Sequence, residues 1–571
     1  MKNTLVFGDY FVFIVYFLIV AGYGYWIYRR KKKAVTDTHD FFLAEGSLTW
    51  WAIGASLIAS NISAEQFIGM SGNGFTIGIA VAAYEWIAAI ALIIVAVWFI
   101  PIFLKNKIFT MPQFLKTRYN ETVALIMAIF WLFLYVFVNL TSILYLGAVA
   151  INNLTGGNEN NFHIIIVALS IFAIFITLGG MKVIGYTDVI QVLVLIIGGL
   201  ATTYVALTVV SKEFGFGENA LAGFNALIKN APDHFHMIFS KPDANSSPQE
   251  VNNYLTIPGL LSYACGIWIV NLNYWGCNQY ITQRALGANL ETARKGILFA
   301  GFLKLLMPVI VMLPGIAAYV LHQKGLLQAE MTANSPSGAV VSDNAYSAIL
   351  GYLPNGLIGL SLAALTAAIV ASLAGKANSI STIFTLDIYK KYINKEASEQ
   401  KMVWTGRVTI LIAIIASILL TWRDALGIGG AGGFTFIQKY TGFVSPGVLA
   451  IFLLGFFWKR TTGTAAVAGI IVGFLLSVLF NVYAPSWFGP ETLLYTAYKN
   501  AAGSYEIPFH ICMGLSFVFT VIVMVLLSLA GPKINPRALT LDKGMFKVSP
   551  GVLAMIVLTL LIISILYVRF W

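Results

Sequence analysis

The chain has 571 residues, of which 58% are hydrophobic and only 10% are charged. A soluble domain carries roughly 25% charged residues, so this composition excludes an ordinary water-soluble fold and favours a chain that meets lipid. The formal net charge of +11 does not indicate a nucleic-acid partner, because the Lys and Arg residues lie in short connectors between apolar runs and form no basic stripe.

Fourteen apolar stretches long enough to cross a membrane follow one another along the chain, since a transmembrane helix needs about 20 mostly apolar residues. The first stretch is followed by the basic run 29–33 and lacks the flanks of a cleavable signal peptide. The predicted spans are 10–28, 50–74, 80–103, 121–151, 161–181, 186–208, 258–283, 296–322, 355–385, 403–421, 434–457, 463–484, 507–530 and 550–570.

The basic residues predict the orientation of these spans. Connectors after odd-numbered spans hold most of the Lys and Arg, as in 29–33, 105–118 and 390–395, and those after even-numbered spans are nearly bare. Because basic connectors stay in the cytoplasm, both termini are predicted to face outward. The short termini favour a bacterial plasma (inner) membrane, and no linker marks off a soluble domain, so residues 1–571 are predicted to form one membrane domain.

Polar side chains interrupt the middle of the second predicted span. Its segment 59–72 reads ASNISAEQFIGMSG and includes Asn61, Glu65 and Gln66. A charge at the bilayer centre costs roughly 2.5–3.5 kcal/mol on insertion scales, so such residues do not suit a lipid-facing helix. They predict a helix that is broken at mid-membrane and lines a cavity, or a polar interface between helices.

The seventh predicted span repeats this pattern in its segment 271–279, NLNYWGCNQ. It lies five spans after the first interrupted span and enters the membrane from the opposite side. Two broken helices in such positions are typical of transporters built from inverted repeats, with the substrate and ion sites at the paired breaks. The sequence therefore predicts a carrier.

Other polar residues within the spans indicate the kind of solute. Glu85, Asn139, Lys304 and Gln438 all lie inside predicted helices. Carboxylate, amide and ammonium groups together can satisfy the donors and acceptors of a neutral polyhydroxyl molecule, whereas an anion would be repelled by Glu65 and Glu85. Lys304 alternatively pairs with a glutamate as part of the structure.

Other classes of protein fit these patterns less well. The chain has no P-loop, nucleophile elbow or paired histidine ligands, so no enzymatic reaction is predicted. A sensor would add a soluble signalling domain, and a channel would show a continuous polar stripe. Among solutes, a sugar is favoured, an inositol-like polyol competes with it, and an amino acid is disfavoured by the glutamates.

Five blocks of the sequence closely resemble the sodium:solute symporter family, most closely its sodium/glucose and sodium/galactose branch. The resemblance covers essentially the whole chain. The blocks are 61–72, Tyr84-Glu85-Trp86, 139–142, 271–284 and 440–459.

This resemblance implies an all-α fold with a LeuT-type core of five plus five helices in inverted repeats, whose first and sixth helices are broken. One helix, 10–28, precedes the core. The two repeats would be 50–208 and 258–457, and three further helices would lie in 463–571.

The resemblance also implies the residues that contact a sugar and those that close over it. Tyr274 would stack on the sugar ring as an inner gate, and Met70, Tyr84 and Phe434 would form an outer gate. A family serine one turn after Glu85 is Ala88 here, which leaves the preferred sugar open. The implied sugar contacts are Asn61, Glu65, Gln66, Glu85, Asn139, Asn271, Lys304 and Gln438.

Na⁺ is the co-transported ion that the resemblance implies. Its ligands would be the backbone carbonyls of Ala59, Ile62 and Ala368 together with the Ser372 hydroxyl. A second family serine is Ala371 in this chain, so the site would offer one side-chain oxygen only.

Lys376 lies one helical turn after Ser372, and an intramembrane lysine is by default a functional residue. Asp188, which resembles a family carboxylate on the ion exit path, is its predicted partner. Two interpretations stay open. Lys376 and Asp188 form a structural ion pair beside a working Na⁺ site, or the ammonium does part of the work of the cation, which would make transport proton-linked or uncoupled.

Overall fold

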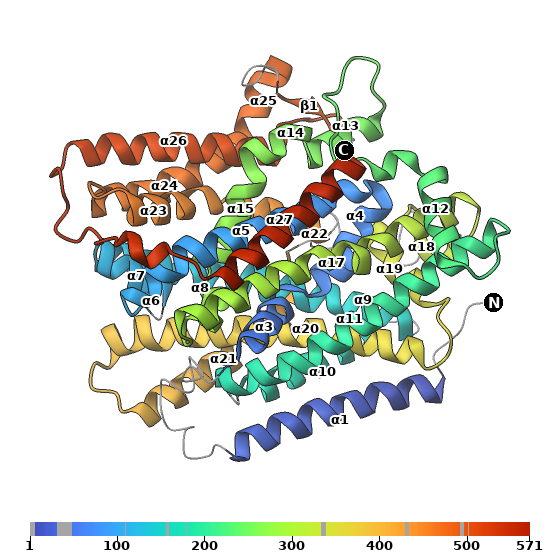
Figure 1. Ribbon diagram of the computed structural model, residues 1–571, viewed down its shortest axis with the longest axis horizontal. Helices are drawn as coiled ribbons and strands as arrows, with labels where there is room; N and C mark the ends of the chain where they lie inside the picture. The colour runs from blue at the N-terminus through green and yellow to red at the C-terminus, as the bar shows by residue number, and fades with distance from the viewer. Residues whose placement is uncertain are drawn as a thin grey trace. The chain divides into compact units, whose positions relative to one another are not determined.

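The computed structural model describes residues 6–30, 48–108, 110–155, 159–178, 180–332, 338–426, 428, 433–491, 496–500 and 502–571. These residues are almost entirely helical (Figure 1). In the described ranges the strands are β1 (Tyr498–Lys499) and β2 (Tyr505–Glu506), which pair antiparallel as a short hairpin. The predicted all-α class is therefore confirmed. The glycine-rich sequence 427–433, which precedes Gln438, lies mostly outside the described residues.

Twelve helices in the described part of the chain are long and apolar enough to cross a membrane. A thirteenth span results if the pair Phe434–Gly442 and Ser445–Phe457, bent by 50°, counts as one. The predicted total of fourteen is not reached, because the stretch 50–74 forms no single long helix. It divides into α3 (Trp50–Asn61), a π-helix (Glu65–Met70) and α4 (Ser71–Thr76).

The chain forms two compact units, each assembled from separate stretches of sequence. The first unit comprises Met1–Ala82, Ala128–Phe235 and Gln283–Phe436. Its long helices are α1 (Phe7–Arg30), α3, α9 (Thr141–Thr155), α10 (Glu159–Thr177), α11 (Gly180–Glu213), α17 (Leu290–Gln323), α20 (Leu357–Thr382) and α21 (Glu399–Thr421). Its shorter elements are α4, α12 (Ala220–Asn230), α18 (Gln328–Met331), α19 (Ala345–Leu350), the π-helices Glu65–Met70, Leu134–Leu140 and Ile383–Ile393, and the 3₁₀ turns Ile79–Ala82, Pro232–Phe235 and Ser342–Asn344.

Helix α20 lies at the centre of the first unit and packs against α1, α3, α9, α10, α11 and α21. Small residues allow this crowding: a Cβ added to Gly198 on α11 would lie 2.8 Å from the Ala364 side chain on α20. Because nearly all of α20 is shielded from lipid, its polar residues need partners inside the protein.

Asp9 on α1 fixes the beginning of α20. Its carboxylate is fully buried and accepts hydrogen bonds from the backbone N–H groups of Gly356 (2.7 Å) and Gly359 (3.0 Å). The first N–H groups of a helix have no partners within it, and the N-terminal end of the helix dipole favours an anion. Asp9 therefore supplies the cap that α20 lacks locally.

The second unit comprises Ala83–Met127, His236–Thr282 and Ile437–Trp571. Three helices run from one unit into the other: α8 (Glu121–Phe133), α16 (Gln279–Leu286) and α22 (Gly433–Gly442). The second unit contains α5 (Ala83–Ile94), α6 (Ile100–Lys105), α7 (Met111–Arg118), α13 (Pro248–Thr256), α14 (Gly259–Leu261), α15 (Ile267–Cys277), α23 (Ser445–Phe457), α24 (Gly463–Val478), α25 (Ala484–Phe488), α26 (Phe509–Leu529) and α27 (Pro550–Phe570). Its π-helices are Val95–Phe99, Ser262–Gly266 and Leu479–Tyr483, and its 3₁₀ turns are Gly489–Glu491 and Lys543–Phe546.

Glycines bring the helices of the second unit close together. A Cβ on Gly276 of α15 would lie 2.5 Å from the Phe99 ring, and one on Gly514 of α26 would lie 2.6 Å from Cys265. Helix α15 packs against α5 and α23, and α26 packs against α23 and α24.

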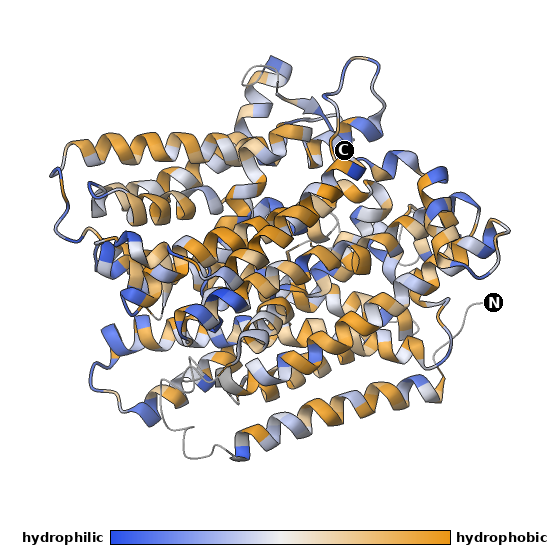
Figure 2. Ribbon diagram, viewed as in Figure 1, coloured by the Kyte–Doolittle hydropathy of each residue, from blue (hydrophilic) through white to orange (hydrophobic). Residues whose placement is uncertain are grey.

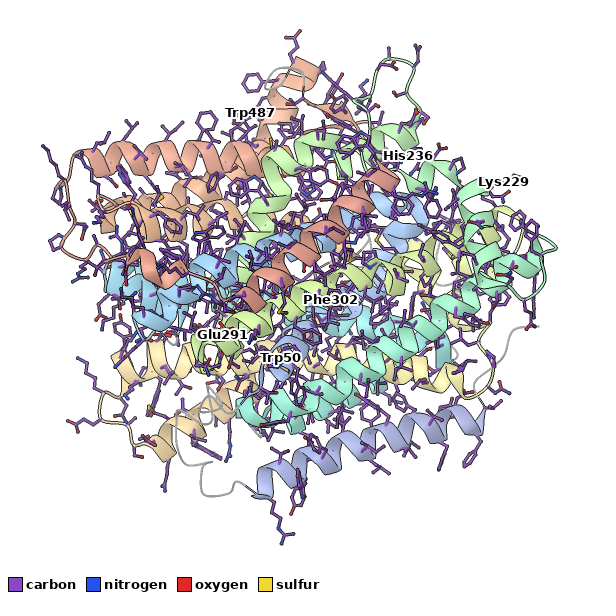
Figure 3. The ribbon with its side chains drawn as sticks, in the orientation of Figure 1. Trp50, Lys229, His236, Glu291, Phe302 and Trp487 are labelled. Carbon is purple, nitrogen blue, oxygen red and sulfur yellow. The ribbon has the colours of Figure 1, made fainter. Side chains whose placement is uncertain are left out.

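The long helices are apolar along most of their length, and the connectors are hydrophilic (Figure 2). Large apolar side chains are exposed on the helices, among them Trp50 on α3 at 41% and Phe302 on α17 at 43% (Figure 3). Side chains of this kind suit a lipid environment and would be costly in water.

Candidate functional site

The first helix break occurs where the sequence predicts it. Helix α3 ends at Asn61, Ile62 is extended (φ −79°, ψ 122°), and helical structure resumes with the π-helix Glu65–Met70. A side-chain cap starts the new segment: Ser63 Oγ accepts from the Glu65 N–H (3.2 Å), and Gln66 Oε1 accepts from the Ser63 N–H (2.9 Å). The S-x-x-Q spacing is that of a capping box, and its Gln66-to-Ser63 bond is present, while the Ser63 hydroxyl bonds the Glu65 N–H in place of the Gln66 N–H. The local sequence therefore favours the break.

The second break also falls within its predicted segment. Helix α15 ends at Cys277, Asn278 is extended (φ −94°, ψ 131°), and α16 begins at Gln279. The Asn278 side chain donates to the Asn273 carbonyl (3.2 Å) and the Tyr274 carbonyl (3.3 Å), which satisfies the open carbonyls at the end of α15. Some of the polar residues in 271–279 therefore support the break itself.

The residues predicted to hold Na⁺ belong to two helices of the first unit, α3 and α20, that pack against each other. Ala59, Ile62, Ala368 and Ser372 are all buried. The Ser372 hydroxyl donates to the Ser60 carbonyl at 3.0 Å, next to the break in α3. Ser372 thus contacts the backbone at the end of α3, beside the break.

Lys376 hydrogen-bonds the Ser372 hydroxyl. Its Nζ donates to Ser372 Oγ at 2.9 Å, and the lysine side chain is 2% exposed. The carboxylate within electrostatic range of this ammonium is Glu65, which lies in the π-helix after the break and also interacts with Lys304. The ammonium, the predicted cation site and a predicted sugar contact therefore form one buried polar cluster.

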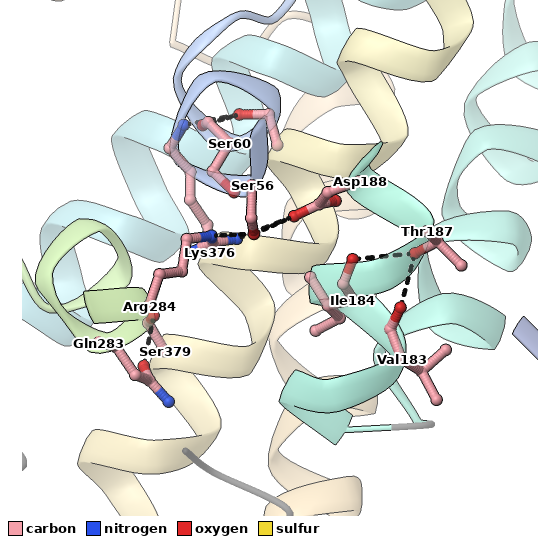
Figure 4. Close-up of polar contacts among 11 residues, drawn as sticks. Ser56, Ser60, Val183, Ile184, Thr187, Asp188, Gln283, Arg284, Lys376 and Ser379 are labelled. Atoms are coloured by element: carbon pink, nitrogen blue, oxygen red, sulfur yellow. Dashed lines mark hydrogen bonds and ion pairs between the residues drawn. The ribbon is translucent and has the colours of Figure 1, made fainter. Parts of the chain in front are cut away.

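Asp188 does not pair with Lys376, and that predicted pairing is wrong. The Asp188 carboxylate on α11 accepts a hydrogen bond from the Ser56 hydroxyl and lies 3.7 Å from the Arg284 guanidinium. Arg284 Nε also donates to Ser56 Oγ at 2.7 Å, so the serine links the two charges (Figure 4). All three side chains are fully or almost fully buried, and a buried charge needs such a partner.

Arg284 and Ser56 are the residues that sequence reasoning missed. Arg284 follows directly after the seventh predicted span, 258–283, and no role in a site was predicted for it. The signal was its position, six residues past the break at Asn278 on a helix of only eight residues, which keeps it inside the protein. A Cβ on Gly375 of α20 would lie 2.6 Å from the Arg284 guanidinium, so a glycine at 375 makes room for it.

The other predicted sugar contacts are also mostly shielded. Asn61, Glu65, Gln66, Asn139 and Lys304, in the first unit, are at most 8% exposed. In the second unit Glu85 and Asn271 are buried and Gln438 is half-buried. Buried polar groups in such numbers are expensive unless they have a function or partners.

The predicted gate residues are found in both units. In the first unit Phe434 packs directly on Gly69, the residue before Met70 (a Cβ there would lie 2.6 Å from Phe434), so these two gate residues are neighbours. In the second unit Tyr84 is buried and its hydroxyl contacts His510, while Tyr274 is half-buried at the end of α15.

Many membrane-length helices, two breaks at polar residues and a buried polar cluster at one of them define an integral membrane transporter. The model of the sodium:solute symporter family matches residues 41–473. The chain belongs to this family, so it is a symporter and not an enzyme, and Na⁺ is its co-transported ion.

Known relatives resemble the chain over most of its length. It is 41% identical to the sodium/glucose cotransporter of Vibrio parahaemolyticus, across 100% of this chain and 99% of that protein. It is 34% identical to the human sodium/myo-inositol cotransporter 2, across 83% of this chain and 69% of that protein. Mouse sodium/glucose cotransporter 1 is 31% identical, across 82% and 71% respectively.

Among solved structures, a Na⁺-coupled sialic acid symporter in a substrate-bound outward-open state has the same fold. It matches with a TM-score of 0.73 at 21% sequence identity, covering 93% of this chain and 100% of that one.

Proposed function

We propose that the chain couples Na⁺ entry to the uptake of a neutral hexose, such as glucose or galactose, by alternating access. The observation that carries this proposal is the buried polar cluster at the first helix break, where Glu65 lies beside an amide, Gln66, and within range of two ammonium groups. Such a set can both accept from and donate to sugar hydroxyls, while Glu65 disfavours a carboxylate substrate.

The proposed sugar contacts are those that the resemblance implies: Asn61, Glu65, Gln66, Glu85, Asn139, Asn271, Lys304 and Gln438. The capping oxygen of Gln66 is already engaged, so Gln66 would offer its amide N–H groups to the sugar. We propose that Tyr274 stacks on the sugar from inside and that Met70, Tyr84 and Phe434 close over it from outside. The contact between Phe434 and Gly69, the residue before Met70, supports a joint movement of Phe434 and Met70.

The proposed architecture has fourteen spans when the broken stretch 50–74 counts as one. The two breaks, at Ile62 and Asn278, support a core of two inverted repeats, 50–208 and 258–457, within a single membrane domain. The basic connectors support a plasma-membrane protein with both termini outside. Na⁺ bound by Ser372 and the carbonyls of Ala59, Ile62 and Ala368 would then stabilise the outward-open state.

A second candidate function follows from Lys376. Because its ammonium hydrogen-bonds Ser372 Oγ (2.9 Å), the lysine itself holds the only side-chain oxygen proposed for Na⁺. In this alternative the tethered ammonium replaces part of the cation, and sugar movement is proton-linked or uncoupled. Na⁺ is the co-transported ion of the family, so the main proposal keeps it as the coupling ion, and this requires that Lys376 leave Ser372 when Na⁺ arrives.

The solute itself is tested by competition. Labelled glucose and galactose should enter proteoliposomes saturably and compete with each other, and Glu65→Gln should raise the sugar concentration needed for half-maximal uptake. Relatives that are named for myo-inositol keep a polyol open, and Ala88 removes one hydroxyl from the pocket. Stronger competition by myo-inositol than by either hexose would make the polyol the substrate, and no uptake of any of the three would reject the proposal.

A further inference from the structure

His510 is a buried histidine whose two ring nitrogens both contact polar side chains of the second unit. It is the second residue of α26, and its side chain is 0% exposed. Nε2 lies 2.8 Å from the Tyr84 hydroxyl on α5, and Nδ1 lies 3.2 Å from the Ser262 hydroxyl in the π-helix Ser262–Gly266. A neutral imidazole has one donor and one acceptor, and each hydroxyl can be either, so both bonds are made in either tautomer.

The contact depends on an unusually close approach of the π-helix Ser262–Gly266 to α26. A Cβ on Gly266 would lie 2.5 Å from His510 Cα, so only glycine allows the π-helix to approach α26 this closely. A phenylalanine would fill a similar volume without the cost of burying a polar ring, so close packing alone does not account for a histidine here.

We propose that His510 is a positioning residue that holds Tyr84 in place for the closure of the outer gate. The inference rests on the proposed function, in which Tyr84 covers the sugar and its neighbour Glu85 binds it. A tyrosine ring turns about two side-chain bonds, and a hydrogen bond on its hydroxyl fixes the far end of the ring. Helix α26, which follows the two proposed repeats, would thereby control the gate at the start of α5.

The test compares His510→Phe, Tyr84→Phe and the double variant. His510→Phe removes both hydrogen bonds but keeps a ring, and Tyr84→Phe removes only the hydroxyl. Each should raise the external sugar concentration for half-maximal uptake by about three- to tenfold, as expected for one lost buried hydrogen bond, with little change in maximal rate. The double variant should be no worse than either single variant, because both remove the same interaction.

Two further variants separate positioning from general stabilisation. His510→Gln keeps a donor and an acceptor on one side chain and should recover most of the sugar affinity. Tyr567→Phe removes a comparable tyrosine hydrogen bond to Tyr263 (3.1 Å) in the same unit and should lower thermal stability without changing sugar affinity. If His510→Phe behaves like Tyr567→Phe, or if the two single effects multiply in the double variant, the proposal is overturned.

A measurement without sugar distinguishes failure of this inference from failure of the proposed function. Backbone hydrogen exchange over residues 83–88 should be faster in His510→Phe than in the unaltered protein and normal in Tyr567→Phe. Unchanged exchange would overturn the positioning role whatever the substrate proves to be. Conversely, an unaltered protein that takes up no hexose would reject the proposed function, while faster exchange would still support the link from His510 to Tyr84.

Discussion

Replacing Lys376 with methionine should strengthen Na⁺ binding. Methionine keeps an unbranched side chain of similar length and removes the ammonium that now hydrogen-bonds Ser372 Oγ at 2.9 Å. The variant therefore releases the one side-chain oxygen of the proposed Na⁺ site and removes a like charge beside it. Both changes act in the same direction.

The size of this effect follows from the geometry. A hard cation contacts oxygen at about 2.4 Å, so Na⁺ on the same hydroxyl would lie roughly 5 Å from the ammonium. Two like charges at that distance repel by about 3 kcal/mol at an effective dielectric constant of about 20. Movement of Lys376 toward Glu65 would relieve part of the repulsion. We therefore expect Na⁺ affinity to rise by about ten- to a hundredfold, where each tenfold corresponds to about 1.4 kcal/mol.

Two quantities measure Na⁺ affinity. One is the Na⁺ concentration that gives half-maximal sugar uptake, and the other is the Na⁺-dependent rise in melting temperature of the purified protein. Lys391→Met is the matched control, since Lys391 also lies on the helical stretch that continues α20 but pairs with Asp387 at 2.7 Å. Its Na⁺ dependence should be unchanged. An unchanged or weaker Na⁺ affinity in Lys376→Met would refute competition between the ammonium and the ion.

Three other predictions concern the interior and one connector. Asp188→Ala should lower the melting temperature markedly, by a loss of about 3–5 kcal/mol, because it leaves Arg284 buried without its carboxylate; a shift no larger than that of a surface Asp→Ala would contradict this. Asp9→Ala removes a charged cap at the start of α20 and should lower the free energy of unfolding by about 1.5–3 kcal/mol, measured by the same melting experiment. Asp9→Asn keeps an acceptor without the charge and should lose less than Asp9→Ala; a loss equal to that of Asp9→Ala would assign the whole effect to the charge. Burial lowers the pKa of His234, whose Nε2 donates to the Phe75 carbonyl. As the pH falls below about 6.5, His234 is therefore protonated in the unfolded protein before it is protonated in the folded protein. Stability should therefore be full above that pH and decline toward pH 5.5, and an equal decline in His234→Gln would assign it to other groups.

The sequence was sufficient for both helix breaks because their causes are local. Ser63 and Gln66 cap the new helical segment through side-chain bonds to its first turn, and the Asn278 side chain closes the end of α15, so each break can be read from a few neighbouring residues. The helical class followed from the long apolar stretches, and the family membership followed from the five sequence blocks that resemble the family. Both signals lie within short continuous pieces of sequence.

The partners of buried charges could not be predicted in this way. Asp188 and Lys376 are complementary in charge, yet Asp188 pairs with Arg284, which the break at Asn278 keeps inside the protein. The choice depends on how α11, α16 and α20 are placed in three dimensions, and no spacing in the sequence encodes it. The contact between Tyr84 and His510, which are 426 residues apart, was missed for the same reason.

The central claim is Na⁺-coupled uptake of a hexose, and gradient-driven accumulation in proteoliposomes tests it most directly. Labelled glucose or galactose should accumulate above equilibrium when an inward Na⁺ gradient is the only driving force, and an imposed proton gradient alone should drive no accumulation. Equilibration without Na⁺, or accumulation with the proton gradient only, would contradict the claim and assign the role of the cation to Lys376.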